Sequence, residues 1–290
     1  MEVKLLFDAQ CTLAESPTWL AEKESYLWVD IEKGILYSLK HEERGVKKWS
    51  FPHRLTLVVP GINGNYILAL DEKLAHFDPE TEKFEWICDV EQDKPQNRCN
   101  DGACDREGRL WVGTMSTKFT DHAGALYCVE KDLTVNKKVD KVSISNGICW
   151  SLDHKTMYFI DSPSREIKAY DYDLSTGNIV FNKVAVKIPE SLGTPDGMCM
   201  DEKGKLWVAH YGGSGVYQWD PDTGSQLDKI NVPAPHVTSC AFGGKDMNQL
   251  LITTAQENMT PEMLEAYPLS GGVFICEMPV KGAQVFGAGF

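Results

Sequence analysis

The sequence predicts an all-β protein, a six-bladed β-propeller in which four-stranded antiparallel blades surround a central channel. The first observation behind this prediction is a sequence pattern that recurs six times in 290 residues. The pattern is a turn followed by a short apolar-aromatic strand. The recurring strands begin at positions 26, 66, 110, 157, 206 and 250, in steps of 40, 44, 47, 49 and 44 residues. A period in this range, with short strands, is typical of propeller blades.

The second observation is that each repeat carries the same further parts in the same order. Another short strand precedes the turn, as at 147–151, and a third strand follows, as at Gly215–Trp219. Turn signals come next, rich in the Asp, Pro and Gly that tight turns require, at 78–81, 173–177 and 220–224. This content amounts to four strands per repeat.

Six blades of about 48 residues account for the whole chain, so we expect residues 1–290 to form a single propeller domain. The strand Val3–Phe7 precedes the first blade. We expect it to pair with the last blade, which would close the ring and cover an exposed edge. A short helical turn is predicted at Pro261–Ala266.

Composition and charge exclude some classes of binding partner. The net charge is −13 and the pI about 5.0, and such a surface repels nucleic acid and anionic lipid. The chain lacks an apolar run of about 18 residues and an N-terminal signal segment, so we expect a cytoplasmic protein. We expect a small-molecule partner and a monomer or weak homo-oligomer. Nine cysteines without a Cys-x-x-Cys spacing predict free thiols.

Six polar residues stand ten or eleven positions before the recurring strands, where the innermost strand of each blade meets the mouth of the channel. They are Glu15, Thr56, Asn100, Asn146, Asp196 and Ser239. A glycine follows three of them directly or after one residue, and Asn-Gly and Asp-Gly usually mark plain turns. Their equal spacing favours a second interpretation, in which all six point into one small volume.

Acidic and amide groups gathered in one place without lysine would repel each other or lack partners, and a divalent cation resolves this. The spacing therefore predicts a metal held by Glu15, Asn146 and Asp196. Oxygen ligands suit Ca²⁺, Mg²⁺ or Mn²⁺. Zn²⁺ usually recruits His or Cys, which the six positions lack, but the identity of the cation stays open among these four.

Other chemistry-bearing residues have weaker signals. Cys104, Cys149, Cys199 and Cys240 fall at similar offsets on the innermost strands, where packing near the narrow axis explains them better than metal ligation. His210 follows a recurring strand and either contacts substrate or packs against a neighbouring blade. A Gly-x-Ser-x-Gly elbow is absent, which disfavours a serine hydrolase.

Several motifs, in order along nearly the whole chain, resemble the family of regucalcin (senescence marker protein), gluconolactonase and luciferin-regenerating enzyme. Residues 267–274 look especially like bacterial sugar-lactone hydrolases of that family. The motifs are Glu15-Ser16-Pro17, Arg98-Cys99-Asn100-Asp101-Gly102, Gly113-Thr114-Met115, Gly124-Ala125-Leu126-Tyr127, Ser145-Asn146-Gly147, Tyr158-Phe159-Ile160-Asp161-Ser162, Pro195-Asp196-Gly197-Met198 and Phe242-Gly243-Gly244.

The resemblance implies metal-dependent hydrolysis of a sugar lactone. It implies that Glu15, Asn146 and Asp196 hold a catalytic divalent metal, that Asp196 also transfers protons, and that Arg98 and Asn100 grip sugar hydroxyls. Arg98 could instead serve only as a counter-ion in an acidic mouth. Lys118 stands where some members carry an acidic substrate contact. The alternatives are a non-enzymatic calcium-binding or regulatory propeller, and a metal-dependent esterase that acts on another ester.

Overall fold

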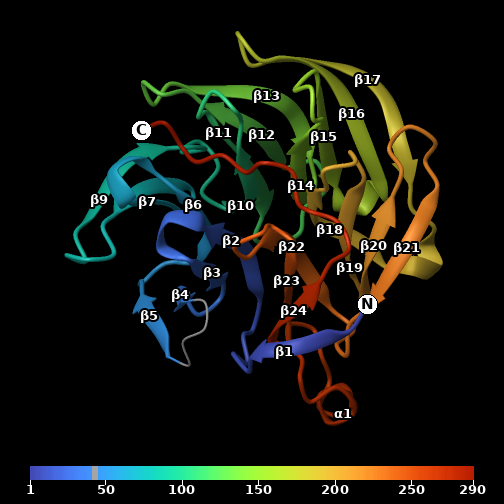
Figure 1. The fold of residues 1–290 in the computed structure, drawn as a ribbon. Helices are drawn as coiled ribbons and strands as arrows, with labels where there is room; N and C mark the ends of the chain where they lie inside the picture. Colours follow the sequence, from blue (N-terminus) through green and yellow to red (C-terminus); the bar gives the residue numbers. More distant parts are fainter. Residues whose placement is uncertain (41–44) are drawn as a thin grey trace.

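Six four-stranded antiparallel sheets stand around a central channel in the computed structural model, which describes residues 1–40 and 45–290 (Figure 1). The first three blades, each from the innermost strand outward, are β2 (Ala14–Leu20), β3 (Ser25–Asp30), β4 (Ile35–Lys40) and β5 (Val46–Ser50); β6 (Leu55–Pro60), β7 (Tyr66–Leu70), β8 (Lys73–Phe77) and β9 (Phe84–Asp89); and β10 (Asn97–Cys104), β11 (Leu110–Ser116), β12 (Gly124–Val129) and β13 (Val135–Val142).

The remaining blades follow the same plan. They are β14 (Ser145–Trp150), β15 (Thr156–Asp161), β16 (Glu166–Asp173) and β17 (Asn178–Lys187); β18 (Thr194–Met200), β19 (Leu206–Tyr211), β20 (Gly215–Trp219) and β21 (Gln226–Asn231); and β22 (Val237–Gly243), β23 (Gln249–Thr254), β24 (Val273–Glu277) and β1 (Val3–Phe7). The second strand of every blade begins within one residue of its predicted start, so the six-bladed prediction is confirmed.

The ring is closed by the N-terminal strand, as predicted. β1 pairs antiparallel with β24, with Val3 opposite Cys276 and Phe7 opposite Val273. The last blade is thus built from both ends of the chain, and the outer edge of β24 is covered. The helix α1 occupies Pro261–Ala266, also as predicted, and Thr260 caps its N-terminus by accepting a hydrogen bond from the Met263 amide.

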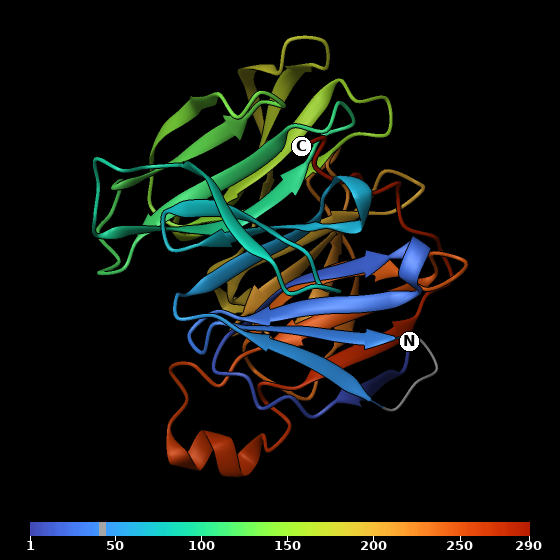
Figure 2. The ribbon, with the colours of Figure 1, turned by 90° about the vertical axis from the view of Figure 1, so that its left-hand side faces the viewer.

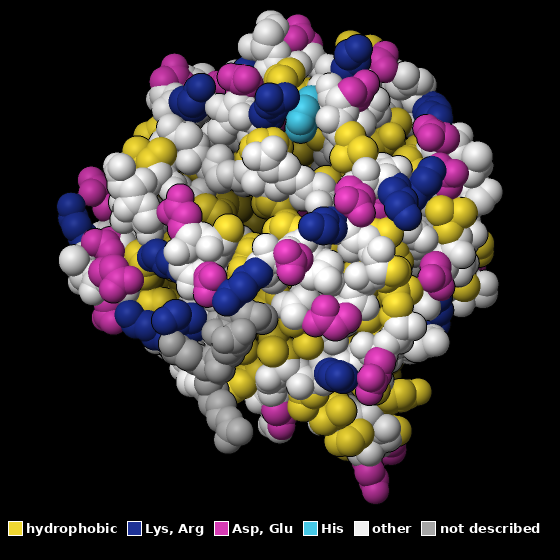
Figure 3. Space-filling model, viewed as in Figure 1, with side chains coloured by type: hydrophobic (Ala, Val, Ile, Leu, Met, Phe, Trp, Pro, Cys, Tyr) yellow, Lys and Arg dark blue, Asp and Glu magenta, His cyan; other side chains and the backbone are white. Residues whose placement is uncertain are grey.

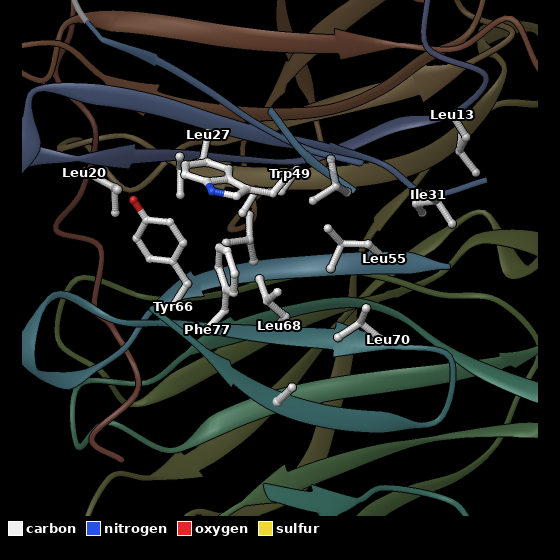
Figure 4. Packing of buried hydrophobic residues seen from close by; sticks show 14 of the residues in the cluster. Leu13, Leu20, Leu27, Ile31, Trp49, Leu55, Tyr66, Leu68, Leu70 and Phe77 are labelled. Carbon is white, nitrogen blue, oxygen red and sulfur yellow. The ribbon is translucent and has the colours of Figure 1, made fainter. Parts of the chain in front are cut away.

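Apolar side chains fill the space between neighbouring blades. Figure 4 shows one such layer, in which Leu27 and Trp49 of the first blade face Leu68 and Phe77 of the second. Tryptophans of the second strands, Trp28, Trp111 and Trp207, are almost fully buried in equivalent layers. Burial of this kind stabilises the fold by roughly 1.5–3 kcal/mol for each large side chain. These tryptophans therefore pack between neighbouring blades.

The two ends of the channel are covered differently. Figure 2 shows α1 at one end, the α1 face, and the C-terminal segment at the other, the C-terminal face. Residues 282–290 cross the C-terminal face, where Ala283 donates to the Met200 carbonyl and Ala288 to the Pro60 carbonyl. No helix within residues 1–40 and 45–290 has the length and apolar character needed to cross a bilayer.

Candidate metal and substrate site

A β-bulge interrupts the pairing of every innermost strand at the positions counted from the sequence. The register shifts lie between Glu15 and Thr18, Leu55 and Leu57, Cys99 and Gly102, Asn146 and Ile148, Pro195 and Met198, and Val237 and Ser239. The six polar residues therefore lie within the strands, at or beside the bulges, and not before the strands as the sequence suggested. A bulge re-aims side chains, which is why bulges recur near functional sites.

The glycines after these residues are explained by crowding between strands. A Cβ added to Gly147 would lie 2.8 Å from the Asp196 carbonyl oxygen, and one added to Gly102 would lie 2.5 Å from the Trp111 carbonyl oxygen. Neither glycine has a positive φ, so close approach of the backbone, and not turn geometry, requires them. The plain-turn interpretation of these dipeptides is wrong, because all three sit inside paired strands.

The three predicted metal ligands come from β2, β14 and β18, and all are buried. Exposed fractions are 8% for Glu15, 4% for Asn146 and 8% for Asp196. The Glu15 carboxylate accepts a hydrogen bond from the Ser16 amide at 3.3 Å. Burial, together with Asp196 and Asp101, holds the pKa of Glu15 well above its ordinary value. The structure thus places the carboxylates of Glu15 and Asp196, two of the predicted ligands, close enough to repel each other.

Hydrogen bonds fix the orientation of the Asn146 amide. Its Oδ1 accepts from Asn100 Nδ2 at 3.1 Å, and its Nδ2 donates to Ser162 Oγ at 2.8 Å. Ser162 Oγ in turn donates to the Pro195 carbonyl at 2.7 Å. Because the serine hydroxyl has given its proton to a carbonyl, it can only accept from Asn146, which leaves the Asn146 oxygen on the Asn100 side.

Arg98 and Asn100 are joined directly. Arg98 Nη1 donates to Asn100 Oδ1 at 2.5 Å and to the Cys99 carbonyl at 2.9 Å, and the arginine is buried. Its charge lowers the pKa of both Glu15 and Asp196, although burial outweighs this effect. The structure therefore brings both predicted substrate residues beside the predicted ligands. The Arg98 guanidinium thus lies near the buried carboxylates of Glu15 and Asp196.

The electrostatics of the site fit a divalent cation. Burial raises the pKa of Asp101 to about 6, and burial with Asp101 and Glu257 raises that of Asp196. Carboxylates in this situation gain from a nearby positive charge. Two carboxylates and an amide oxygen form a donor set for a hard cation. Within the described residues no three His, Cys, Asp or Glu side chains group as a metal site, so the amide and water would have to complete the coordination.

Asp101 and Glu257 are residues that the sequence did not assign. Asp101 directly follows Asn100 in the bulge of β10, and its position in an Asn-Asp-Gly motif could have drawn attention to it. Glu257 carried no such signal, because it lies in the loop between β23 and α1 and outside the counted offsets. Burial, and then Glu32, raises its pKa.

The backbone of Glu257 is pinned from three sides. Its amide donates to the Thr12 carbonyl at 2.9 Å. Its own carbonyl accepts from Tyr211 Oη and lies against His236 Nδ1, both at 2.9 Å. The rings of Tyr211 and His236 stack with centroids 4.1 Å apart. The loop thus fixes the backbone of Glu257 at the α1 face, and its carboxylate is close enough to Arg98 and Asp196 for the charges to interact.

His210 lies opposite Pro195, on the strand next to β18. It is fully buried, stacked on Tyr217 with centroids 4.0 Å apart, and its Nδ1 lies 2.9 Å from the Leu192 carbonyl oxygen. Trp219 Nε1 is 3.4 Å from its Nε2. Of the two interpretations from the sequence, the packing role fits this geometry. Lys118, in contrast, is exposed in the loop that follows β11.

The chain is similar to a known protein family and to curated proteins. The family described as SMP-30/Gluconolactonase/LRE-like region matches residues 13–256. Regucalcin of Oryctolagus cuniculus is 36% identical over 288 residues, which cover 97% of this chain and 96% of the relative. The chain belongs to the SMP-30/gluconolactonase/LRE-like family. The resemblance inferred from the motifs is therefore confirmed.

Solved structures of the SMP-30/gluconolactonase/LRE-like family superpose closely on the chain. A luciferin-regenerating enzyme matches with a TM-score of 0.94 at 28% identity, covering 100% of this chain and 99% of the other. A regucalcin of Agrobacterium tumefaciens, described as a calcium-binding protein, matches with a TM-score of 0.93 at 28% identity, covering 100% and 97%. The fold and the family are shared, while the names of these relatives differ.

Proposed function

We propose that the protein is a metal-dependent hydrolase that converts a sugar lactone, an aldonolactone, to its aldonic acid. The observation that carries this proposal is the convergence of buried Glu15, Asn146 and Asp196 beside the Arg98–Asn100 pair at one end of the channel. Membership of a family that includes gluconolactonase supports it. The site combines carboxylates for proton transfer with donors for hydroxyl groups, as lactone hydrolysis requires.

Glu15, Asn146 and Asp196 would hold one divalent cation, Ca²⁺, Mg²⁺, Mn²⁺ or Zn²⁺. Their oxygen donors favour the harder three, and the regucalcin of Agrobacterium tumefaciens is a calcium-binding protein. When bound, such a cation polarises a carbonyl oxygen and acidifies water. The positive charge of the cation would then offset the repulsion between the buried carboxylates around it.

Asp196 is the proposed acid–base group. Its carboxylate takes a proton from the attacking water as the new carbon–oxygen bond forms at the lactone carbonyl. It then returns that proton to the ring oxygen as the ester bond breaks, so that the product carries one carboxyl and one hydroxyl group. In the cation-free site, Asp101 and Glu257 help to raise the pKa of Asp196, and a bound cation would act in the opposite direction by favouring the ionised carboxylate.

Arg98 and Asn100 act by positioning the sugar. Asn100 Nδ2 already donates to the Ser145 carbonyl at 2.7 Å and to Asn146, so its amide is fixed before substrate binds. Arg98 is similarly fixed by its two acceptors. Groups that are held in place lower the entropic cost of orienting the lactone. Because Asn100 donates to Asn146, a residue proposed to bind the sugar is in direct contact with a proposed metal ligand.

Glu257 is the proposed determinant of sugar preference. Its backbone is fixed at the α1 face and its carboxylate interacts with the charge of Arg98, and carboxylates accept hydrogen bonds from sugar hydroxyls. The neighbouring Glu32 is paired with Arg54 at 3.0 Å, whereas within residues 1–40 and 45–290 no ion pair at this distance engages Glu257.

The second candidate function is a calcium-binding propeller without catalysis. One observation favours it, the description of the regucalcin of Agrobacterium tumefaciens as a calcium-binding protein. Such a protein needs the ligands but not the Arg98–Asn100 pair. Metal binding without turnover would therefore distinguish it from the lactonase.

The test is proton release from a panel of aldonolactones and aryl esters. The protein is stripped with a chelator and resupplied separately with Ca²⁺, Mg²⁺, Mn²⁺ or Zn²⁺. We expect fast hydrolysis of at least one lactone, lost on chelation and restored by a cation. If cation binding is confirmed calorimetrically but no lactone is hydrolysed above its spontaneous rate, the lactonase proposal fails. Faster hydrolysis of an aryl ester than of every lactone would instead identify an esterase.

A further inference from the structure

A cavity of about 280 Å³ extends through the channel from the bulges, where Asp101 lines it, toward the C-terminal face. The ends of the innermost strands form its walls, and residues 283–286 of the C-terminal segment contribute to its outer rim. Figure 3, which views the C-terminal face, shows a recess with hydrophobic atoms at its bottom. Leu152 and Val285 line the cavity and are 48% and 58% exposed, which provides a route in from solvent.

The walls of this cavity are unusually rich in sulfur. Six of its 28 lining residues are Cys or Met, whereas the whole chain has 9 Cys and 9 Met in 290 residues. Packing near a narrow axis, the expectation from the sequence, accounts for small residues but not for sulfur around open space. The six are Cys104, Cys149, Cys199, Cys240, Met198 and Met200.

Two of these thiols are in direct contact. Cys199 on β18 and Cys240 on β22 have sulfur atoms 3.7 Å apart. Cys240 Sγ also lies 3.3 Å from the Trp207 carbonyl oxygen and donates to it. The Cys240 proton is thereby engaged, so the Cys199 thiol is the donor between the two sulfurs. The lone pairs of neighbouring sulfurs from two blades are thus presented side by side.

We propose that Cys199 and Cys240 form a second metal site, specific for a soft monovalent cation such as Cu(I). Thiolate and thioether ligands select Cu(I), while carboxylate and amide oxygens select hard cations. Two sulfurs in contact need only a small separation to admit a two-coordinate ion between them. Two sulfur–copper bonds replace two sulfur–hydrogen bonds, and the two protons pass to solvent.

The surroundings of the two thiols favour this cation over the hard ones proposed for the other end of the channel. Burial, with Cys240 as its neighbour, holds the pKa of Cys199 well above its ordinary value. The empty site is therefore uncharged and offers nothing to Ca²⁺ or Mg²⁺, whereas a thiophilic ion displaces thiol protons itself. Met198 and Met200 add polarisable thioethers to the same walls.

The test is an anaerobic titration of the full-length chain with Cu(I) in competition with the coloured chelator bicinchoninate. All proteins carry Cys88→Ser, since Cys88 is a partly exposed thiol outside the cavity. We expect the chain to take one Cu(I) from the chelator. Cys199→Ser and Cys240→Ser should each lose that ion, and Cys276→Ser, which changes a buried thiol on β24, should keep it.

A second measurement uses unaltered cysteines, so that a poorly folded variant cannot decide the outcome. Copper-loaded and copper-free protein are alkylated with N-ethylmaleimide in mild denaturant and mapped by mass spectrometry. Cu(I) should protect Cys199 and Cys240 selectively. Failure to compete with bicinchoninate, retention of copper in the Cys199→Ser, Cys240→Ser double variant, or protection of other cysteines instead would each overturn the proposal.

Discussion

The two halves of the channel share the same strands but present opposite chemistry. On β18, Asp196 faces the α1 half and Cys199, three residues further on, lines the cavity of the C-terminal half. On β14, Asn146 and Cys149 are related in the same way. Both halves are buried, so burial alone does not decide what a channel binds. The side chains decide it: carboxylates and amides gather at the bulges, where Asp101 also lines the cavity, and thiols and thioethers line the channel beyond them.

The largest effect is expected from a change in the oxygen half. Asp196→Asn removes the proposed acid–base group and should lower the turnover rate by roughly 10²–10⁴-fold. The matched change in the sulfur half, Cys149→Ser, should leave turnover nearly unchanged. Rates are measured by proton release after metal content has been equalised. Similar losses in the two variants would show that the halves are not functionally separate.

The next-largest effect is on the stability of the protein and involves His210. Burial lowers the pKa of His210 from 6.5 to about 4. The unfolded chain therefore takes up the proton first as pH falls, and the contribution to stability, complete above pH 6.5, is lost progressively toward pH 4. The full loss is about 3 kcal/mol.

Denaturant unfolding between pH 7.5 and 4.5 measures this loss. His210→Gln should lose less stability over this range than the unchanged protein, and its lactone turnover at pH 7.5 should stay normal. Buried carboxylates such as Asp196, whose pKa is raised, act with the opposite sign, so the comparison between the two proteins isolates the histidine. An equal acid loss in both would show that folding does not lower the pKa of His210.

A smaller effect tests the boundary between the halves. In Gly197→Ala the new Cβ would lie 2.9 Å from the Ser239 backbone Cα, with the Ser239 side chain closer still. This overpacking should lower the free energy of unfolding by about 1–3 kcal/mol and disturb turnover through Asp196. Gly45→Ala, where a Cβ meets nothing within 4 Å, is the control in denaturant unfolding. A fully stable Gly197→Ala protein would mean that the blades can separate freely here.

The smallest effect should sharpen the description of the oxygen half. Glu257→Gln removes a charge from the proposed sugar-binding mouth and should raise KM by roughly 2- to 10-fold, unequally among lactones, with kcat little changed. Glu262→Gln, in the exposed first turn of α1, should change neither constant. Steady-state kinetics on pentono- and hexonolactones measure both. If the KM of Glu257→Gln matches that of the unchanged protein on every lactone, Glu257 takes no part in substrate recognition.

Much of the candidate site could be predicted because each blade repeats one local pattern. Counting back from the second strands located Glu15, Asn146 and Asp196, all of which proved to be buried at the bulges. The count could not show that these residues lie inside paired strands. Nor could it separate Asp101 from an ordinary turn residue, because bulge geometry depends on the neighbouring strand. Glu257 escaped because its place depends on contacts with Thr12, Tyr211 and His236, residues distant in the sequence.

The sequence by itself determined the number of blades, the closing strand Val3–Phe7, the helix Pro261–Ala266 and the family, because strand, turn and motif signals are written in neighbouring residues. Only the tertiary structure decided which side chains meet. Asp101 approaches Glu15 and Asp196, and Cys199 touches Cys240, although the sulfurs belong to residues 41 positions apart. The physical reason is that ring closure brings six separate strands to one axis, and contacts across that axis leave no local trace in the chain.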